Sequence, residues 1–306
     1  MSLLVVGSIA FDSIKTPHDR VEDVLGGSAV YFSLAARLLS PVRVVGVVGR
    51  DFPAEHLDLL ASRGIDTEGI EVAEGKTFRW SGEYFEGMNK RRTLSVDLNV
   101  FADFQPRLPA RFRDSRFVFL ANGSPATQLS VLDQVERPRF VMADTMDLWI
   151  RTQREGLGKV LRRVDGLVIN DDEALLLTEA RNLVLAGKAI LRMGPRLVVL
   201  KKGEHGALLF TGDETVPLPA YPLEEVRDPT GAGDSFAGGL MGRLARTGGD
   251  GPIAPGRFKT ALAAAMVVAS FSVEDFGVRR LLEVRPEEVE ERLRRYCSLI
   301  HVDLDR

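Results

Sequence analysis

Residues 226–240 read Val226-Arg227-Asp228-Pro229-Thr230-Gly231-Ala232-Gly233-Asp234-Ser235-Phe236-Ala237-Gly238-Gly239-Leu240. Asp228-Pro229 ends any strand that precedes it, because proline cannot donate to a sheet ladder. The small residues that follow predict a helix over residues 232–246. Gly231 and Gly233, at its start, tolerate unusual dihedral angles and let a ligand approach the backbone. This junction between a loop and a helix is therefore a candidate binding site.

The backbone at this junction is suited to an anion. The N–H groups of Gly231, Ala232 and Gly233 point outward from a helix N-terminus, where the helix dipole also attracts negative charge. Asp234 lies beside them. A carboxylate in a first helical turn is commonly only a partner of the dipole. It can also accept a hydroxyl proton while the N–H groups hold a phosphoryl group, as phosphoryl transfer requires.

Two other phosphate-binding motifs are missing. The chain contains no G-x-x-x-x-G-K-[ST] sequence, which excludes a P-loop NTPase. Phe236 stands where the third glycine of a dinucleotide fingerprint belongs, and the first apolar run, residues 3–6, leads only to the single glycine Gly7. A nicotinamide-dependent dehydrogenase is therefore disfavoured.

Short apolar runs recur outward from this stretch, at residues 3–6, 42–48, 117–120, 140–143, 166–169 and 197–200. Their continuous apolarity indicates burial on both faces, as in a parallel sheet. Helical patterns at residues 28–39, 54–63 and 129–135 lie between several of them. The alternation predicts the α/β class, with a doubly wound, mostly parallel sheet.

Residues 77–84 break this pattern, because the apolar Phe78, Trp80 and Tyr84 alternate with polar residues. A turn at 86–89 and a returning strand at 92–96 follow, which is typical of antiparallel strands with one exposed face. We expect a small antiparallel β lid with its strands within residues 72–100, together with the segment around 13–25. A surface hairpin that only packs is the alternative. The whole of residues 1–306 is expected to form one domain.

The composition excludes several classes of protein. Lys and Arg number 40 and Asp and Glu 43, a net charge of −3, so the basic excess that binds nucleic acid is missing. The single cysteine, Cys297, excludes an internal disulfide, and four scattered histidines argue against a His-based metal cluster. No run approaches the ~18 apolar residues of a membrane span, and residues 3–11 lack the basic flank of a signal peptide. We expect a cytoplasmic protein with neither nucleic-acid nor membrane partners.

Residues 228–239 resemble the C-terminal signature of the PfkB (ribokinase-like) carbohydrate kinases. Four further segments resemble motifs of that family in the family's order, namely residues 7–12 (Gly-Ser-Ile-Ala-Phe-Asp), 26–38 (beginning Gly-Gly), 170–173 (Asn-Asp-Asp-Glu) and 202–207 (Lys-Gly-Glu-His-Gly-Ala). The resemblance covers nearly the whole chain. It implies a ribokinase-like fold and ATP-dependent phosphorylation of an alcohol group of a sugar, nucleoside or cyclitol.

The resemblance also implies catalytic roles, residue by residue. Asp234 matches the general base that deprotonates the acceptor hydroxyl during direct in-line transfer. Gly231, Ala232 and Gly233 match the anion hole for the charge that develops on the phosphoryl group. Removing one such donor in comparable sites costs about 10²–10³ in rate.

The nucleotide site is implied in the same way. Asn170 and Glu173 match residues that arrange Mg²⁺, with Glu173 acting through water, and the ATP phosphates. Lys202, Gly203 and Gly206 match the turn against which the nucleotide lies. From the residues alone, the first pair also reads as the capped start of a helix and the last three as a hairpin turn.

The acceptor site is expected at the carboxyl ends of the strands, where open α/β sheets bind ligands. Asp12 matches the family's substrate carboxylate, and Gly26 and Gly27 let the backbone approach the same ligand. Asn122 follows the strand at residues 117–120. Tyr31 stands where many family members have an asparagine that contacts the substrate, so simple ribokinase-like specificity is in doubt.

Aromatic residues near the expected acceptor site leave the substrate open. They are Phe11, Tyr31, Phe32 and Trp80. Their faces suit stacking on a nucleobase, which favours a nucleoside, and they suit equally well packing between lid and body.

Two further expectations follow from the resemblance. Asp228 and Thr230 match the region where some members bind K⁺ beside the anion hole. Lids of the family often form a dimer interface, so a homodimer through the lid is expected. A sensor that keeps the fold without catalysis is the alternative function, and the intact Asp234 argues against it.

Overall fold

The structure, a computed structural model, describes residues 2–212, 214–246 and 251–301. Its central sheet has nine strands, in the order β13 (Thr215–Leu218), β12 (Ala207–Phe210), β11 (Leu197–Lys201), β10 (Gly166–Asn170), β9 (Phe140–Ala143), β8 (Phe117–Leu120), β1 (Leu3–Val6), β4 (Val42–Gly49) and β5 (Ile65–Ala73). The strands from β5 to β11 pair in parallel, and β12 and β13 add an antiparallel edge. All six apolar runs are strands of this sheet.

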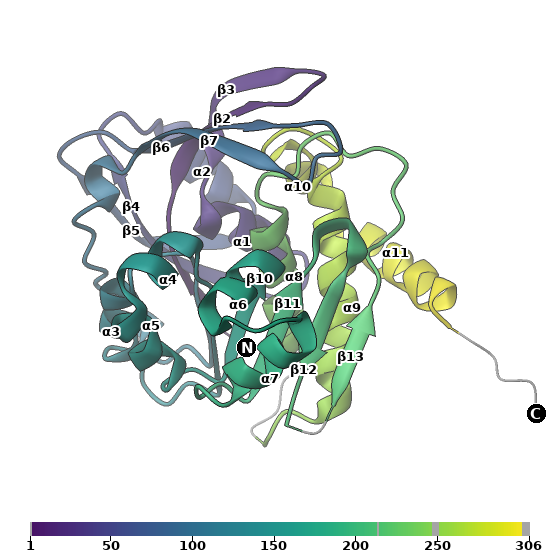
Figure 1. Ribbon diagram of the computed structural model, residues 1–306. Helices are drawn as coiled ribbons and strands as arrows, with labels where there is room; N and C mark the ends of the chain where they lie inside the picture. The colour runs from purple at the N-terminus through teal and green to yellow at the C-terminus, as the bar shows by residue number, and fades with distance from the viewer. Residues whose placement is uncertain (1, 213, 247–250, 302–306) are drawn as a thin grey trace, which may run out of the picture.

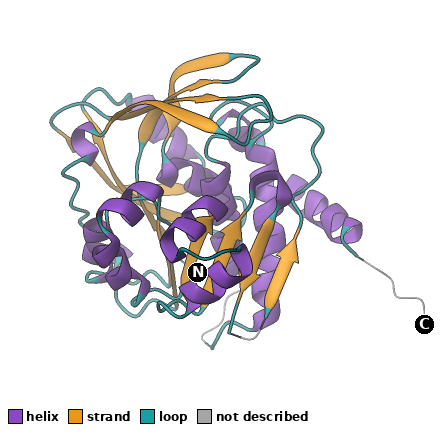
Figure 2. Cartoon of the chain, in the orientation of Figure 1, coloured by secondary structure: helices purple, strands orange, loops and turns teal. Residues whose placement is uncertain are grey.

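Helices cover both faces of the sheet (Figures 1 and 2). One face packs against α1 (Ser28–Ala36), α2 (Ala54–Ser62), α8 (Ala232–Arg246), α9 (Pro255–Ser272), α10 (Arg279–Glu283) and α11 (Pro286–Leu299). The other packs against α3 (Pro125–Leu132), α4 (Asp147–Thr152), α5 (Arg154–Leu161), α6 (Asp171–Thr178) and α7 (Leu183–Leu191). Leu3 and Leu4, neighbours on β1, are both fully buried and belong to opposite cores. The predicted doubly wound α/β fold is confirmed.

Two predicted helix boundaries are wrong. The helix expected over residues 28–39 ends at Ala36. The helix expected over residues 129–135 is α3, which begins earlier, at Pro125. Ser124 caps α3 by accepting a hydrogen bond from the Thr127 N–H at 3.1 Å, and the proline at the first helical position has no N–H to satisfy.

A second, four-stranded sheet lies above the body in Figure 1 and is named the lid sheet here. Its order is β3 (Arg20–Gly26), β2 (Ala10–Lys15), β6 (Phe78–Tyr84) and β7 (Arg91–Asp97). The pairs β2–β3 and β6–β7 are antiparallel, as expected of a small antiparallel lid, and the two hairpins join through a parallel pairing of β2 with β6. Since β2 follows β1 after three residues, the first strand of the body leads directly into the lid.

Short 3-10 helices complete the fold. They are η1 (Asn99–Phe101), η2 (Ala110–Phe112) and η3 (Gly203–His205). Across the described residues, no helix combines the length and apolarity that crossing a membrane requires.

Candidate active site

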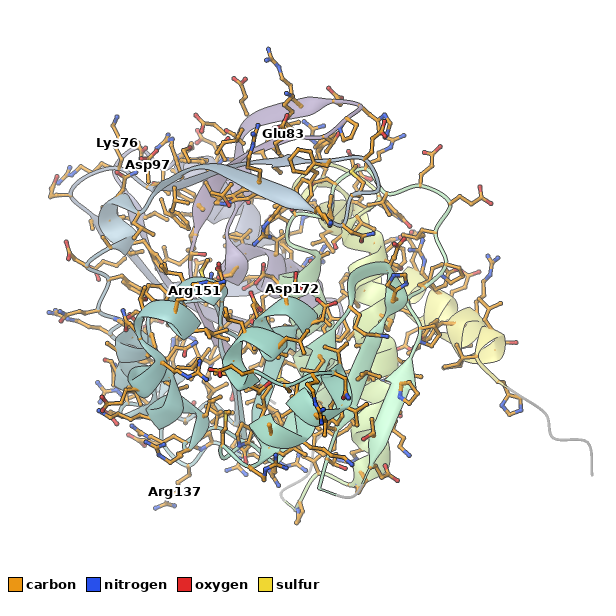
Figure 3. The ribbon with its side chains drawn as sticks, viewed as in Figure 1. Lys76, Glu83, Asp97, Arg137, Arg151 and Asp172 are labelled. Carbon is orange, nitrogen blue, oxygen red and sulfur yellow. The ribbon has the colours of Figure 1, made fainter. Side chains whose placement is uncertain are left out.

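A cleft with a cavity volume of about 410 Å³ lies between the lid sheet and the carboxyl ends of the parallel strands. In Figure 3, Glu83 marks the lid sheet and Asp172, on α6, marks the body beneath it. The cleft is lined by residues of both parts of the molecule. They include Asp12, Phe78, Trp80, Arg91, Thr93 and Val96 of the lid sheet, and Gly27, Tyr31, Asn122, Asp144, Trp149, Asn170, Glu173, Lys201, Thr230, Gly231, Gly233 and Asp234 of the body. Carboxyl ends of strands are the usual ligand-binding edge of such sheets.

The start of α8 forms one end of this cleft. Gly231 precedes the helix with a φ of 71°, a conformation that residues with side chains rarely adopt. A Cβ there would come within 2.2 Å of the Tyr31 ring, so only glycine fits above that ring. Gly231 and Gly233 line the cleft, whereas Ala232 does not, and its N–H donates to the Pro229 carbonyl at 3.2 Å.

Asp234 lies in the first turn of α8 and faces the cleft. Burial, reinforced by the nearby Asp144 carboxylate, raises the pKa of Asp234 to about 7, against the opposing effect of Lys201 and Arg91. A carboxylate with a pKa near neutrality is well matched to taking a proton from a hydroxyl group.

Asp12 lies across the cleft, on β2 of the lid sheet, with 4% of its surface exposed. Burial raises its pKa to about 7, although a hydrogen bond from the Gly27 N–H lowers it. A Cβ at Gly26 would come within 2.0 Å of the Asp12 carboxylate, so glycine at this position leaves that carboxylate its room. Gly26 itself does not line the cleft, whereas Gly27 does.

Tyr31, on α1, is 1% exposed, and its hydroxyl group has no hydrogen-bond partner. Burial, with the nearby Asp12 and Asp228 carboxylates, raises its pKa well above the usual value, so the hydroxyl stays protonated. The ring supports Gly231 from below and the residue lines the cleft. A buried donor without a partner next to the cleft is suited to bonding a ligand.

Asn170 and Glu173 form a capping box at the start of α6. The Glu173 N–H donates to Asn170 Oδ1 at 2.8 Å, and the Asn170 N–H donates to Glu173 Oε2 at 3.1 Å. Both residues also line the cleft, so the capped helix and the ligand site inferred from the sequence coincide in space. Burial, with the nearby Asp144 carboxylate, raises the pKa of Glu173 to about 7.

These residues fit Mg²⁺ in the way that this ion usually binds. Among the described residues, no group of three or more His, Cys, Asp or Glu side chains could hold a metal on its own. Mg²⁺ seldom uses such a cage and is commonly held by one or two carboxylates, water and the phosphates of a substrate. The cleft-facing Glu173, whose Oε1 takes no part in the capping box, suits that role.

The turn at residues 202–206 lies beside the cleft. Lys202, Gly203 and Gly206 do not line it, and η3 joins the antiparallel strands β11 and β12 there. The lid contacts this turn, because Asn89 Nδ2 donates to Glu204 Oε1 at 2.6 Å.

Lys201 and Arg91 line the cleft although the sequence did not single them out. Lys201 ends β11, with its Nζ 3.6 Å from the Asp144 carboxylate. Arg91 begins β7, and its guanidinium lies 5.8 Å from the centre of the Trp80 ring. The sequence did offer a signal for Lys201, because a charged residue at the carboxyl end of a buried apolar strand is placed at the ligand-binding edge of the sheet. Arg91 lay outside the motifs, in the turn region of the lid.

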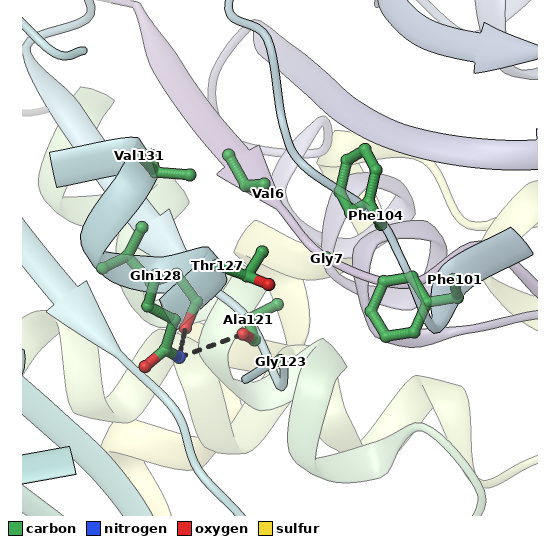
Figure 4. A pocket seen from close by; sticks show the side chains of 10 residues that line it. Val6, Gly7, Phe101, Phe104, Ala121, Gly123, Thr127, Gln128 and Val131 are labelled. Atoms are coloured by element: carbon green, nitrogen blue, oxygen red, sulfur yellow. Dashed lines mark hydrogen bonds between the residues drawn. The ribbon is translucent and has the colours of Figure 1, made fainter. Parts of the chain in front are cut away.

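Asn122 and Asp144 follow the neighbouring strands β8 and β9. Buried Gln128, on α3, joins the ends of these strands by donating to the carbonyls of Leu120, Ala121 and Asp144 at 3.3, 3.2 and 2.9 Å. Figure 4 shows Gln128 and its hydrogen bond to Ala121. The apolar cavity beside it holds about 10 Å³, which is too small for a substrate.

Asn122 is fixed in the cleft by two neighbours. Its Oδ1 accepts a hydrogen bond from the Trp149 ring N–H at 3.0 Å, and its Nδ2 lies 3.1 Å from the Met146 sulfur. The amide therefore presents a defined face beside an aromatic wall.

Asp228 lies outside the cleft and is fully buried. Its two carboxylate oxygens accept hydrogen bonds from the N–H groups of Thr230 and Gly277, both at 2.8 Å. Thr230 lines the cleft and its hydroxyl donates to the Tyr84 hydroxyl of the lid at 3.1 Å. The loop before α8 is thereby tied to both the lid and the segment after α9.

Comparison with known proteins identifies relatives of this chain. Over 252 residues the chain is 29% identical to a cytidine kinase of Thermococcus kodakarensis, covering 80% of this chain and 89% of that protein. Over 296 residues it is 29% identical to a nucleoside kinase of Methanothermobacter thermautotrophicus, covering 90% and 91%.

Solved structures share the fold. The nucleoside kinase of Methanocaldococcus jannaschii superposes with a TM-score of 0.76 at 19% identity, over 96% of this chain and 98% of that one. A putative ribokinase II of E. coli in complex with ATP and Mg²⁺ gives 0.74 at 22% identity, over 96% and 99%.

Residues 2–285 match the sequence model of a protein family described as pfkB family carbohydrate kinase. This match establishes the family. That range contains all five motifs and every residue of the cleft named above, and it confirms the resemblance drawn from the sequence. The chain belongs to the pfkB family of carbohydrate kinases, ATP-dependent enzymes that transfer a phosphoryl group to an alcohol.

Proposed function

We propose that this kinase phosphorylates a hydroxyl group on the sugar of a nucleoside. The observation that carries the proposal is the pairing, across one cleft, of the Asp234 carboxylate beside the start of α8 with the buried Asp12 carboxylate of the lid. Two carboxylates suit a ligand with several hydroxyl groups. The relatives named cytidine kinase and nucleoside kinase, each matched over most of its length, support a nucleoside as that ligand.

The walls of the cleft support the same substrate. Phe78, Trp80 and Phe101 lie on the lid side, and Trp149 lies on the body side. Aromatic rings provide the flat apolar surfaces on which a nucleobase stacks. A simple sugar would leave such surfaces uncovered.

In the proposed reaction, Asp234 takes the proton of the acceptor hydroxyl. The N–H groups of Gly231 and Gly233, with Ala232 shaping the turn between them, stabilise the charge of the phosphoryl group in transit. Asp12, Gly27 and the pre-positioned amide of Asn122 bind the acceptor, and Gly26 leaves room for Asp12.

Nucleotide binding is assigned to the start of α6 and the turn at residues 202–206. Asn170 and Glu173 would hold Mg²⁺ through water, and Lys202, Gly203 and Gly206 would lie against the nucleotide. Magnesium, when bound, neutralises the phosphate oxygens that otherwise repel the attacking group.

Other features stay predictions. Asp228 and Thr230 are proposed to border a K⁺ site. The fully buried Asp228 carboxylate suits such a site, since the N–H groups of Thr230 and Gly277 that donate to it carry no charge. A homodimer through the lid sheet is supported by the exposed Leu94 of β7, which does not line the cleft. One kinase domain and a cytoplasmic location remain expectations from the sequence.

The test is ADP formation from Mg-ATP with a panel of nucleosides, pentoses, hexoses and cyclitols. We expect turnover with nucleosides, and a loss of about 10²–10⁴-fold in Asp234→Asn. Asp58→Asn, an exposed position on α2, is the matched control and should keep wild-type turnover. Turnover confined to a hexose or cyclitol would overturn the nucleoside assignment, and a fully active Asp234→Asn would overturn the base assignment.

A further inference from the structure

Lys201 is a buried cation that the proposed reaction does not yet use. It ends β11, its side chain is 18% exposed, and it lines the cleft. A Cβ placed on Gly233 would lie 2.9 Å from Lys201 Nζ, so the ammonium group lies against the start of α8. The ammonium group and the Gly233 backbone therefore border the same small volume.

The surroundings keep Lys201 charged. Burial alone lowers its pKa, but the carboxylates of Asp144, Glu173 and Asp234 outweigh burial and raise that pKa above its usual value. Asp144 is the nearest at 3.6 Å, which is beyond the length of a direct hydrogen bond. The ammonium group therefore has donors left for a ligand.

The balance of charge in the cleft requires such a cation. Asp12, Asp144, Glu173 and Asp234 line the cleft, whereas Lys201 and Arg91 are the cations among its described lining residues. Arg91 belongs to the lid and is exposed. On the body side, where the proposed anion hole lies, Lys201 is thus the positive side chain that can meet a polyphosphate.

We propose that Lys201 is a further catalytic residue, which donates a hydrogen bond from its ammonium group to the phosphoryl group in transit, and that Asp144 positions it. The inference rests on the proposed function. The acceptor hydroxyl gives its proton to Asp234, and its oxygen forms a bond to the γ-phosphorus. The bond from that phosphorus to the bridging oxygen breaks, with its electron pair leaving on ADP. Lys201 keeps its proton throughout.

Lys201→Met removes the charge at similar side-chain length. We expect turnover to fall about 10²–10³-fold, as for loss of an oxyanion donor, with the acceptor KM changing less than about threefold. By calorimetry, affinity for the Mg²⁺ complex of the non-hydrolysable analogue AMP-PNP should fall at least about tenfold, whereas affinity for ADP, which lacks the γ group, should stay within about twofold. Lys201→Arg should recover part of both losses.

The control is Lys188→Met, at an exposed lysine on α7, which should behave as wild type. If Lys201→Met unfolds, Lys201→Gln serves in its place. The inference would be overturned if a folded Lys201 variant changed the affinities for AMP-PNP and for ADP by the same factor relative to wild type. That outcome would count whatever the acceptor proves to be.

A purely structural role is tested by a double variant. If Lys201 only neutralises Asp144, then Lys201→Met with Asp144→Asn should regain both AMP-PNP affinity and turnover, because no unpaired charge is left. If Lys201 binds the phosphoryl group, both stay low. An inactive Asp234→Asn beside a fully active Lys201→Met would defeat this inference alone, whereas an active Asp234→Asn would defeat the proposed function itself.

Discussion

At the scale of single residues, burial of like charges sets the pH at which the proposed chemistry can run. Asp234 and Asp12 each have a pKa of about 7, raised mainly by burial. Asp234 must be ionised to accept a proton, and Asp12 must be ionised if both of its oxygens are to accept hydrogen bonds from the acceptor. We therefore expect kcat/KM to fall on the acid side of about pH 7, with a slope approaching two protons.

Asp144→Asn should separate these two steps. The Asp144 charge raises the pKa of Asp234, whereas burial and the Asp228 and Asp234 charges raise the pKa of Asp12. In that variant the titration of Asp234 should move to lower pH while that of Asp12 stays in place. Between the two pKa values, the slope of log kcat/KM against pH should then fall to one. A pH–rate profile that shifts as a whole, or not at all, would contradict the assignment; Asp58→Asn is the control.

Tyr31→Phe tests the buried hydroxyl group of Tyr31. Since this hydroxyl has no hydrogen-bond partner, its removal should leave the free energy of unfolding unchanged or slightly higher. We expect the acceptor KM to rise about 5–10-fold with the ATP KM unchanged, because the bound acceptor is proposed to satisfy the hydroxyl. An unchanged acceptor KM would remove Tyr31 from the acceptor site.

Neighbouring residues also show where sequence reasoning stops. Asp234 and Gly231 belong to one continuous motif, and both line the cleft. The adjacent Lys201 and Lys202 differ, since Lys201 ends β11 and Lys202 already belongs to the turn that follows it. Which of the two faces the cleft depends on how β11 sits in the sheet, and the resemblance pointed to Lys202 whereas the structure turns Lys201 into the cleft.

At the scale of elements, the start of α6 combines a helix cap with the proposed metal site. Asn170→Ala removes the cap and should cost about 1 kcal/mol of stability. Asn170→Ser keeps an oxygen for the Glu173 N–H and should keep the stability. Both should lose about tenfold in activity, because both lack the amide beside the proposed Mg²⁺ site.

Asn182 offers the matched control for this pair. Its Oδ1 caps α7 by accepting from the Leu185 N–H at 2.9 Å, away from the cleft. Asn182→Ala should therefore lose stability and keep activity, as judged by denaturant unfolding and steady-state assay. A fully active Asn170→Ser would show that Asn170 serves only as a cap.

The lid was only partly accessible to sequence reasoning. Alternating apolar residues predicted β6 and its return strand, because a half-exposed hairpin is a local pattern. The parallel pairing of β2 with β6 joins segments more than sixty residues apart, Ala10 against Phe78, and no local pattern encodes it. The position of Arg91 could not be predicted for the same reason. Arg91 lines the cleft only because the pairing of β2 with β6 places the lid sheet over the body.

At the scale of the whole molecule, the charged cleft costs stability. The pKa values of Asp12, Glu173 and Asp234, each about 7, lie above the ordinary values of 3.8 for Asp and 4.5 for Glu. The folded chain therefore binds more protons than the unfolded chain between about pH 4.5 and 7, and stability falls as pH rises through that window. Burial also raises the pKa values of Asp144 and Asp228. His56, whose pKa burial lowers, acts in the opposite direction but is one group against five.

We therefore expect the unliganded enzyme to have a lower Tm at about pH 8 than at about pH 5. Asp12→Asn should narrow that difference by raising the Tm at pH 8, whereas Asp58→Asn should leave it unchanged. Scanning calorimetry at the two pH values provides the measurement. A wild-type Tm that rises from pH 5 to pH 8 would contradict the expected balance of protons.

The placement of Asp12 on the lid strand β2, opposite Asp234 on the body, has a consequence for the hydrolysis of ATP by water. A nucleoside sugar can bond both carboxylates at once, because it carries several hydroxyl groups. A water molecule bonded to Asp234 leaves Asp12 buried without that partner, and sites built around a hydroxyl reject ligands that lack it by large factors. If Asp12 and Asp234 act as proposed, this arrangement would disfavour hydrolysis of ATP in the absence of the alcohol.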